Sequence, residues 1–313
     1  MSANKATSFV LSVLLTLCTT AYTTVALGSA HPNAHQDKSV SILQMVEHPA
    51  INATCQGIMD ELKDHGVLIS SQSAQGNIHL VTQIAQQYVG NHPSVLVGIG
   101  TTASQSLMAA NHTAHIPIVF SSVTDPKGAK LIDNVSHPES IVTGVSNYVD
   151  PDIQLKFFKK VLPTLEKLGV IYNPGEANSV SLLQKMKIAA KNNGIEIIAA
   201  PANHSAEVAL ATHYLLSQVN ALFINNDNTA LSAFDSIVRI SRTQKIPVFC
   251  SDNDMLEHGA LATMGADQYE IGRQTGQIIL QILAGKDVSE LPVSFPNKTI
   301  ELVNEKIKAE FRL

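Results

Sequence analysis

Three acidic residues in the second half of the chain follow apolar, strand-like segments: Glu176, Asp227 and Asp252. The loops that hold them are rich in Asn and Ser and contain no Lys or Arg. Carboxylates form strong, charge-assisted hydrogen bonds with ammonium groups. Because these loops lack cations, they suit phosphate, sulfate or a dicarboxylate poorly. We therefore predict that they bind the ammonium end of a small ligand.

Neutral hydroxyl groups stand at the corresponding places in the first half of the chain. The turn at 98–103 brings Thr101 and Thr102 to the start of a predicted helix, and Ser122 and Thr124 follow the next strand. Free N–H groups at a helix start, together with hydroxyls, suit a carboxylate. The two sets of loops therefore describe a zwitterionic ligand. Helix capping and turn formation by the same residue types is the alternative interpretation.

A regular framework must position these loops, and the sequence indicates an α/β fold. Short runs rich in Val and Ile alternate with helical segments, the pattern of parallel βαβ units. Several runs are apolar without alternation, which is typical of strands covered on both faces. In such sheets, ligands bind beyond the carboxyl ends of the strands. The predicted strands are 40–46, 67–71, 95–99, 116–120 and 141–145, then 168–172, 195–199, 221–224, 246–249 and 260–264.

The end of the chain does not begin a third domain. Residues 268–283 have the apolar spacing of one helix, and 291–293 and 299–303 are short extended pieces that we interpret as crossings between lobes. The expected fold class is α/β, with two doubly wound parallel-sheet lobes joined by a multi-strand hinge. The predicted limits are a signal peptide at 1–30, a tether at 31–38, lobe 1 at 39–146 and 266–293, lobe 2 at 147–265 and 294–313, and hinge segments near 146–152, 265–271 and 293–299.

The amino terminus predicts export. Lys5 precedes an uncharged stretch, 6–30, whose apolar centre at 9–17 has the length of a signal-peptide core. Small residues suit cleavage after Ala26 or Ala30. We therefore predict a periplasmic protein. The alternative is an uncleaved membrane anchor, which the threonines in the later half of this stretch disfavour.

The three cysteines bear on the same prediction. Leu17 precedes Cys18 where a bacterial lipobox has Gly, Ala or Ser, so a lipid anchor is not expected. Export would leave Cys55 and Cys250, which lie far apart in the sequence. We expect both to be buried free thiols.

Length and composition limit the classes of function. The 313 residues are long for one domain, and 45% hydrophobic with 15% charged residues excludes a disordered or fibrous chain. There are 21 basic and 26 acidic residues, for a formal net charge of -5, and no basic run occurs. Nucleic acid is therefore not an expected partner. Aromatic residues make up only 5% and Trp is absent, which counts against a sugar site.

The sequence holds no motif for a metal, a cofactor or catalysis. None of the 12 histidines has metal-ligand spacing, and no Gly-x-Ser-x-Gly turn occurs. Asp252 and Asp254 suit a helix cap better than an acid–base pair. The turn at 98–103 loosely fits a dinucleotide-binding pattern, but it follows the third strand and no acidic residue ends the next one. We predict no enzyme and no cofactor, with an exported dinucleotide-dependent oxidoreductase as one alternative.

Seven motifs, in order along about residues 40–290, resemble those of a known family. They are 46–50 (VEHPA), 74–76 (AQG), 117–126 (PIVFSSVTDP), 143–146 (TGVS), 172–179 (YNPGEANS), 227–229 (DNT) and 272–276 (GRQTG). On these motifs the sequence resembles the ABC-transporter substrate-binding proteins of the tryptophan/tyrosine-type family. The loop at 224–226 departs from the pattern, because it has amides where relatives more often have Pro or Thr.

The resemblance implies a type I periplasmic-binding-protein fold, no catalysis and the capture of an amino acid, with aromatic amino acids typical. It also implies an ABC permease in the inner membrane as the partner of a monomeric protein; a sensing role coupled to a receptor is the alternative. The ligand-binding residues that it implies are Thr101, Thr102, Ser122 and Thr124 in lobe 1 and Glu176, Asn178, Ser179, Asp227, Asn228 and Asp252 in lobe 2.

Overall fold

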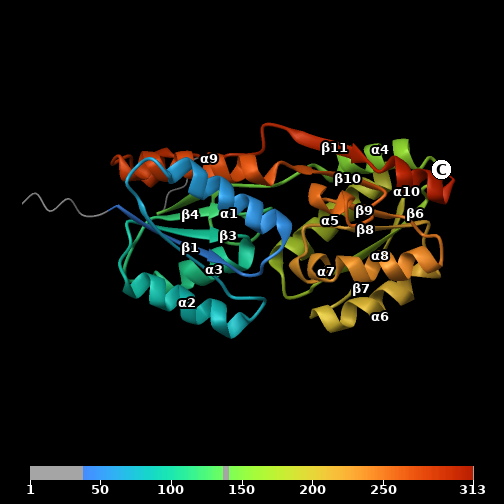
Figure 1. The fold of residues 1–313 in the computed structure, drawn as a ribbon, viewed down its shortest axis with the longest axis horizontal. Coiled ribbons are helices and arrows are strands. Elements are labelled where there is room, and N and C mark those ends of the chain that lie inside the picture. The colour runs from blue at the N-terminus through green and yellow to red at the C-terminus, as the bar shows by residue number, and fades with distance from the viewer. Residues whose placement is uncertain (1–37, 137–140, 313) are drawn as a thin grey trace, which may run out of the picture. The chain divides into compact units, whose positions relative to one another are not determined.

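The computed structural model describes residues 38–136 and 141–312. Within them the chain forms two α/β lobes, each built on one β-sheet with helices on both faces (Figure 1). The expected fold class is therefore confirmed. The predicted signal peptide, and all of the predicted tether except Lys38, lie outside the described residues. No helix in the described ranges is long and apolar enough to cross a membrane.

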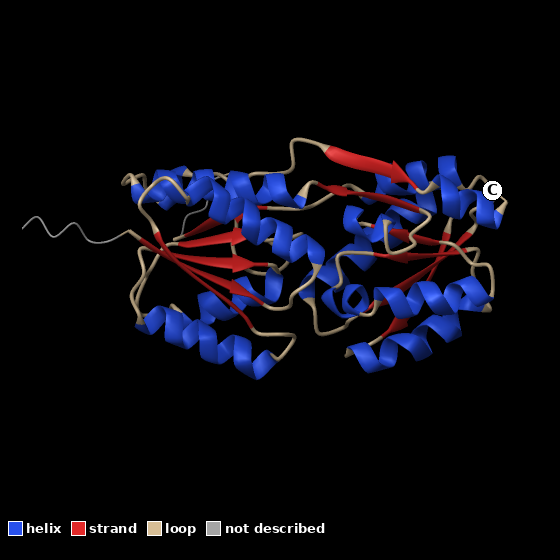
Figure 2. Cartoon of the chain, in the orientation of Figure 1, coloured by secondary structure: helices blue, strands red, loops and turns tan. Residues whose placement is uncertain are grey.

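Lobe 1 contains a five-stranded parallel sheet in the order β2-β1-β3-β4-β5. Helices α1 and α9 cover one face, and α2 and α3 cover the other (Figure 2). Ile42, Val97 and Val119 lie in register on neighbouring strands and are fully buried, as their apolar runs predict. The elements are β1 (Ser39–Gln44), α1 (Pro49–Leu62), β2 (Leu68–Ser73), α2 (Ile78–Gly90), β3 (Val95–Ile99), α3 (Thr101–Ala110), β4 (Ile118–Ser121), β5 (Val142–Val145), α9 (Gln268–Leu283) and the short 3-10 helix η2 (Val288–Glu290).

Lobe 2 contains a six-stranded sheet in the order β11-β10-β9-β8-β6-β7. The segment that we expected to be a crossing, 299–303, is strand β11, which pairs antiparallel with β10, so this sheet is not wholly parallel. The elements are α4 (Pro151–Val161), β6 (Lys167–Tyr172), α5 (Ala177–Asn192), β7 (Glu196–Pro201), α6 (Ser205–Leu216), β8 (Ala221–Ile224), α7 (Asn228–Ser232), α8 (Phe234–Thr243), β9 (Val248–Cys250), η1 (Asn253–Leu256), β10 (Ala262–Ala266), β11 (Thr299–Val303) and α10 (Glu305–Phe311).

The chain passes between the lobes three times: after β5, after β10 and between η2 and β11. Two of these crossings are joined by backbone hydrogen bonds, because Ser294 N–H donates to Gly144 O at 3.0 Å and Ser146 N–H donates to Ser294 O at 2.8 Å. The Gln154 side chain on α4 donates to Met264 O on β10 at 2.9 Å. The first and third crossings are therefore hydrogen-bonded side by side, and the second leaves β10 close to α4.

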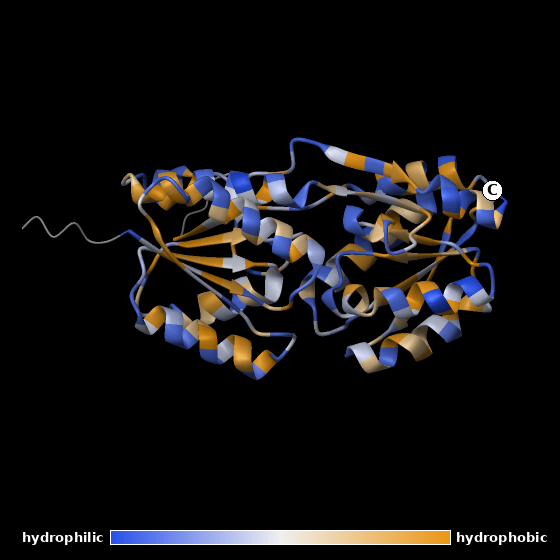
Figure 3. Cartoon of the chain, in the orientation of Figure 1, coloured by the Kyte–Doolittle hydropathy of each residue, from blue (hydrophilic) through white to orange (hydrophobic). Residues whose placement is uncertain are grey.

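Polarity follows this architecture. The strands are mostly hydrophobic, whereas the loops where the lobes meet are largely hydrophilic (Figure 3). Cys55 and Cys250 are buried and free, as expected. The polar loops between the lobes are therefore the place to look for a ligand site.

Helices α1 and α9 pack closely against each other at two glycines, one on each helix. Gly57 faces Gly272, and a methyl group on either residue would overlap the backbone of the other helix. This close approach sets the start of α9 beside α1, so that Gln268 reaches Thr54. Two segments more than 200 residues apart in the sequence therefore share one corner of the boundary between the lobes.

Candidate ligand-binding site

A small cavity lies between the lobes, where the carboxyl ends of strands from both sheets meet. Its volume is about 30 Å³, room for a few water molecules, so the lobes are nearly closed on one another. Ala50 and Ile51 of lobe 1 and Leu231 of lobe 2 supply apolar side chains to its lining, and the described lining contains no Phe, Tyr or Trp. The other lining residues are His48, Gly100, Thr101, Ser122, Thr124, Asn147, Asn178, Asn226, Asn228, Asp252 and Gln268.

Helix α3 begins at this cavity on the lobe 1 side. Its N-cap is Gly100, whose φ of 85° favours glycine, and no side-chain cap accepts from the first N–H groups. Thr101 lines the cavity at the same point. The partial positive charge of an uncapped helix N-terminus attracts anions. This corner therefore suits a carboxylate, the group that the sequence predicts for lobe 1.

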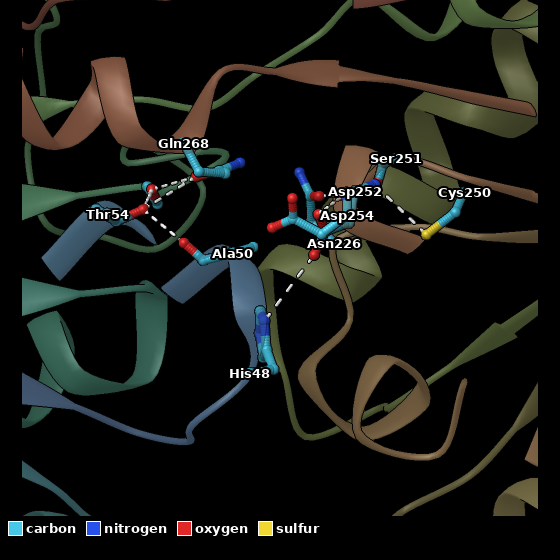
Figure 4. Close-up of polar contacts among 10 residues, drawn as sticks. His48, Ala50, Thr54, Asn226, Cys250, Ser251, Asp252, Asp254 and Gln268 are labelled. Carbon is cyan, nitrogen blue, oxygen red and sulfur yellow. Dashed lines mark hydrogen bonds and ion pairs between the residues drawn. The ribbon is translucent and has the colours of Figure 1, made fainter. Parts of the chain in front are cut away.

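The Gln268 side chain is held by two hydroxyl groups. Its Oε1 accepts from Ser122 Oγ at 2.7 Å and from Thr54 Oγ1 at 3.3 Å, and these two hydroxyls lie 3.1 Å apart. Because its oxygen is engaged, the amide nitrogen of Gln268 points away from Thr54 (Figure 4). The N–H groups of Gln268 are therefore further donors on the lobe 1 side of the cavity.

Glu176 is engaged within lobe 2. Its Oε2 accepts from the backbone N–H of Asn228 at 3.0 Å and from the Asn228 side chain at 2.7 Å, while Oε1 accepts from Thr229 N–H at 3.2 Å and Thr229 Oγ1 at 2.9 Å. The carboxylate thus satisfies the start of helix α7. Its place in the site is to position the loop at 225–229.

Asp227 is likewise engaged. Its Oδ2 accepts from Ser179 Oγ at 2.5 Å and from Asn173 N–H at 2.6 Å, and its Oδ1 accepts from Ala230 N–H at 2.7 Å. Burial, with the charge of Glu176 as a second cause, raises the pKa of Asp227 to about 6. Neither this carboxylate nor Ser179 lines the cavity. Asp227 therefore ties the start of α7 to the loop between β6 and α5 and to the start of α5.

Asp252 differs from both, because one of its oxygens has no partner. Oδ1 accepts from Asp254 N–H at 3.1 Å, but Oδ2 is buried and makes no hydrogen bond with the described residues. Oδ2 lies 4.0 Å from His48 Nδ1 of lobe 1 (Figure 4), too far for a hydrogen bond. Burial, with a smaller contribution from the charge of Asp254, raises the pKa of Asp252 to about 6.

His48 faces Asp252 from the loop after β1. Its side chain is 8% exposed, and neither ring nitrogen has a hydrogen-bond partner in the described part of the chain. Burial lowers the pKa of His48 to about 4, although the nearby Asn228 side chain opposes this shift. The imidazole is therefore neutral at neutral pH and does not form an ion pair with Asp252.

Asn178 presents another unpartnered acceptor. Its amide nitrogen donates to Asn226 O at 2.6 Å, which fixes the orientation of the side chain and leaves its buried Oδ1 without a partner among the described residues. Asn226 Oδ1 in turn accepts from Ser251 Oγ at 2.7 Å. The lobe 2 wall therefore offers acceptors at Asn178 and Asp252, set in a network that is otherwise satisfied.

Six of the ten predicted ligand-binding residues line the cavity: Thr101, Ser122, Thr124, Asn178, Asn228 and Asp252. Thr102 and Glu176 line an adjoining groove of about 640 Å³, which Asn228 also lines. Ser179 and Asp227 line neither space. The polar lining residues that were not predicted are His48, Asn147, Asn226 and Gln268.

A polar contact outside the cavity also joins the lobes. Asp125, in the loop after β4, accepts from Ser181 Oγ at 2.5 Å and from Lys185 Nζ at 2.7 Å, and both donors lie on α5 of lobe 2. Lys185 Nζ also lies 4.9 Å from the ring centroid of Tyr148, in the first crossing. Although burial alone would raise it, the hydrogen bonds from Lys185, Ser181 and Gly128 hold the pKa of Asp125 below its usual value. This contact stabilises the nearly closed arrangement.

Loss of the Lys185 charge is expected to favour the open arrangement. Because the pair is partly exposed, Lys185→Met should weaken ligand affinity only about threefold, and 0.5 M salt should remove most of the difference from wild type. Small-angle scattering of the ligand-free protein should give a larger radius of gyration for the variant. Lys187→Met, on the exposed face of the same helix, is the control. Equal affinities and radii for both variants would contradict this expectation.

Comparisons with known proteins show the family of this chain. Residues 39–312 match the model of a family described as ABC transporter substrate binding protein. A tyrosine-binding protein from Clostridioides difficile (strain R20291) is 30% identical over 279 residues, 87% of this chain and 80% of that protein. The crystal structure of an ABC domain from Streptococcus pneumonia in complex with L-Trp is 30% identical, with a TM-score of 0.85, and the match covers 88% of this chain and 95% of that one.

A third relative bears on the arrangement of the lobes. The ligand-free, open structure of a substrate-binding protein with adhesive properties from Clostridium difficile is also 30% identical, with the same coverage of 88% and 95%, but its TM-score is 0.68. The complex with L-Trp therefore resembles this chain more closely than the open structure does, at equal identity. The lobes of this chain stand in an arrangement close to that of the ligand-bound relative.

Proposed function

This chain belongs to the family of ABC transporter substrate-binding proteins, and we propose that it captures a free amino acid between its lobes and delivers it to an ABC importer. The observation that carries this proposal is the division of polar groups in the cavity. Lobe 1 offers donors at the start of α3 and at Gln268, which suit a carboxylate. Lobe 2 offers the free oxygens of Asp252 and Asn178, which suit an ammonium group.

An aromatic amino acid is the ligand that we favour. One relative is named for tyrosine and another was solved with L-Trp, each at 30% identity to this chain. In this chain, Ala50, Ile51 and Leu231 provide apolar surface for a ring. Without Phe, Tyr or Trp in the described lining, such a ring would be held by aliphatic and backbone surface.

Capture requires the lobes to separate, because the present cavity of about 30 Å³ is too small to admit an amino acid. We propose that the ligand docks in the open cleft and that its contacts with both lobes then favour closure. A permease that distinguishes the closed from the open form would then receive loaded protein. We also propose a periplasmic, monomeric and non-catalytic protein exported by the predicted signal peptide.

Isothermal titration of the twenty amino acids tests the proposal. The protein is first unfolded, freed of any retained ligand by dialysis and refolded. We expect L-tryptophan or L-tyrosine to bind with micromolar or tighter affinity. Their α-keto analogues, which lack the ammonium group, should not bind. No heat with any amino acid, from protein whose refolding is verified by circular dichroism, would overturn the proposal. Binding of NADH, followed by fluorescence, would instead favour the dinucleotide alternative.

A further inference from the structure

Three buried acceptors that have no hydrogen-bond partner among the described residues belong to side chains that line the cavity. They are Asp252 Oδ2 and Asn178 Oδ1 from lobe 2 and a ring nitrogen of His48 from lobe 1. Buried polar groups are nearly always hydrogen-bonded, and leaving one unsatisfied is costly. Three such groups in one small space therefore indicate that a ligand atom belongs among them.

The directions of the two oxygens are fixed by the other atoms of their side chains. Asp252 is anchored through Oδ1 by the N–H of Asp254, and Asn178 is anchored through its amide nitrogen by the carbonyl of Asn226. The free oxygens of Asp252 and Asn178 therefore cannot turn to protein donors without breaking existing hydrogen bonds. His48 immediately precedes Pro49 at the start of α1, which restricts its backbone.

The ligand group that fits these acceptors must donate several hydrogen bonds. His48 is neutral because burial lowers its pKa, so one of its ring nitrogens carries a lone pair. Asp252 offers a carboxylate oxygen and Asn178 an amide oxygen. A primary ammonium group has three N–H donors and one positive charge, which matches three acceptors, one of them charged.

One pair of acceptors approaches the spacing of a shared nitrogen. His48 Nδ1 and Asp252 Oδ2 are 4.0 Å apart, too distant for a direct hydrogen bond. Two hydrogen bonds of ~2.9 Å at the tetrahedral angle of an ammonium nitrogen hold their acceptors about 4.7 Å apart. A small separation of the lobes, which the cavity also needs in order to hold a ligand, therefore brings this pair to the spacing that one ammonium nitrogen requires when Nδ1 is the unprotonated ring nitrogen.

Resting on the amino-acid function proposed above, we propose that His48, Asn178 and Asp252 each accept one N–H of the ligand's primary ammonium group. His48 is then a specificity-determining residue that selects primary over secondary amines. Since His48 belongs to lobe 1 and the two oxygens belong to lobe 2, the ammonium group also joins the lobes. Closure is therefore coupled to the presence of a primary amine on the ligand.

The experiment pairs a ligand methyl group with removal of the imidazole. Isothermal titration compares L-tryptophan with N-methyl-L-tryptophan, which has one N–H fewer, and L-tyrosine with N-methyl-L-tyrosine. The wild-type protein should bind the primary amine about 30-fold more tightly, the loss expected for one charge-assisted hydrogen bond. In His48→Ala, affinity for the primary amine should fall at least tenfold and the preference for it should drop below threefold.

Two further variants complete the test. His48→Phe keeps a ring in the cavity but has no acceptor, so it should lose affinity as His48→Ala does if hydrogen bonding and not packing is responsible. His213→Ala, on the exposed face of α6, should behave as wild type. If the amino acids bind but both His48 variants keep wild-type affinity and the wild-type preference, this inference is overturned and the proposed function stands. If no amino acid binds the wild-type protein, the proposed function itself fails.

Discussion

Asp252→Asn should bind the amino-acid ligand about 100-fold more weakly than the wild-type protein, because one partner of a buried charge pair is lost. The wild-type carboxylate supplies the charged acceptor that faces the cavity. An Asn side chain still accepts from Asp254 N–H and caps η1, so the fold should persist. Isothermal titration at pH 7.5 measures the loss of affinity, and circular dichroism checks the fold.

The same substitution should stabilise the ligand-free protein. Burial raises the pKa of Asp252 from 3.8 to about 6, so ionisation is less favourable in the folded than in the unfolded chain. Below the unfolded value both states are protonated and the penalty is absent. The penalty grows as the pH rises from 3.8 to about 6 and is complete above it. A shift of this size corresponds to at most about 3 kcal/mol.

Urea unfolding between pH 4 and pH 8 tests the sign of this effect. The free energy of unfolding of Asp252→Asn minus that of the wild-type protein should be near zero at pH 4. This difference should become more positive as the pH rises toward 7. Asp227→Asn is the matched comparison, because its new amide would face the N–H of Asn173 and should destabilise the protein at neutral pH. Undiminished affinity in Asp252→Asn would show that the ammonium group is not held by Asp252.

The fold was predictable because its information is local. The predicted strand at 95–99 and the predicted helix at 268–283 agree with β3 and α9, since continuous apolar runs and helical periodicity mark fully covered elements. The antiparallel pairing of β11 was not predictable in the same way. An extended segment such as Thr299–Val303 can pair in either direction, and its partner β10 lies more than 30 residues earlier.

Most of the residues that line the cavity on both lobes were predictable, but the different contacts that the three carboxylates make were not. Three carboxylates follow three strands, yet Glu176 and Asp227 are occupied by backbone and hydroxyl donors, many of them about 50 residues distant. Of the three, Asp252 alone has a buried oxygen with no hydrogen-bond partner in the described part of the chain. The residues near Gln268 in the sequence do not indicate that it lines the site, because the Ser122 hydroxyl that orients it is 146 residues away. The position of His48 in the loop after β1 was a usable signal, since ligands bind at strand-end loops in this class of fold.

Gly272→Ala is expected to lower the free energy of unfolding by about 2–3 kcal/mol, as overpacking of a tight contact does. A β-carbon at Gly272 would overlap the carbonyl oxygen of Thr54 and touch Gly57 Cα at 3.0 Å. These are backbone atoms of α1, so no side-chain rotation relieves the contact and the helices must separate. Gly90→Ala, at the end of α2 with no atom near the new methyl, is the control and should be neutral or slightly stabilising.

The contact between Gly57 and Gly272 is reciprocal, and this gives a sharper form of the prediction. Gly57→Ala would overlap Tyr269 O of α9 and should cost a similar amount. Once one methyl group has separated the helices, the second finds part of the space already open. The loss in Gly57→Ala/Gly272→Ala should therefore be clearly smaller than the sum of the single losses. Urea unfolding of the four proteins measures this coupling, and strictly additive losses would mean that the two glycines act independently.

Separation of helices α1 and α9 should also weaken ligand binding. Helix α9 begins at Gln268, whose oxygen accepts from Ser122 at 2.7 Å and from Thr54 of α1 at 3.3 Å, so moving α9 away from α1 loosens the second of the two contacts that orient the Gln268 amide. Gly272→Ala should therefore bind the amino acid more weakly even where it remains folded, whereas Gly90→Ala should not. If Gly272→Ala is folded and destabilised but keeps wild-type affinity, the contact between the glycines contributes to stability and not to ligand binding. A joint loss would tie the packing of two distant segments to the donor that faces the ligand.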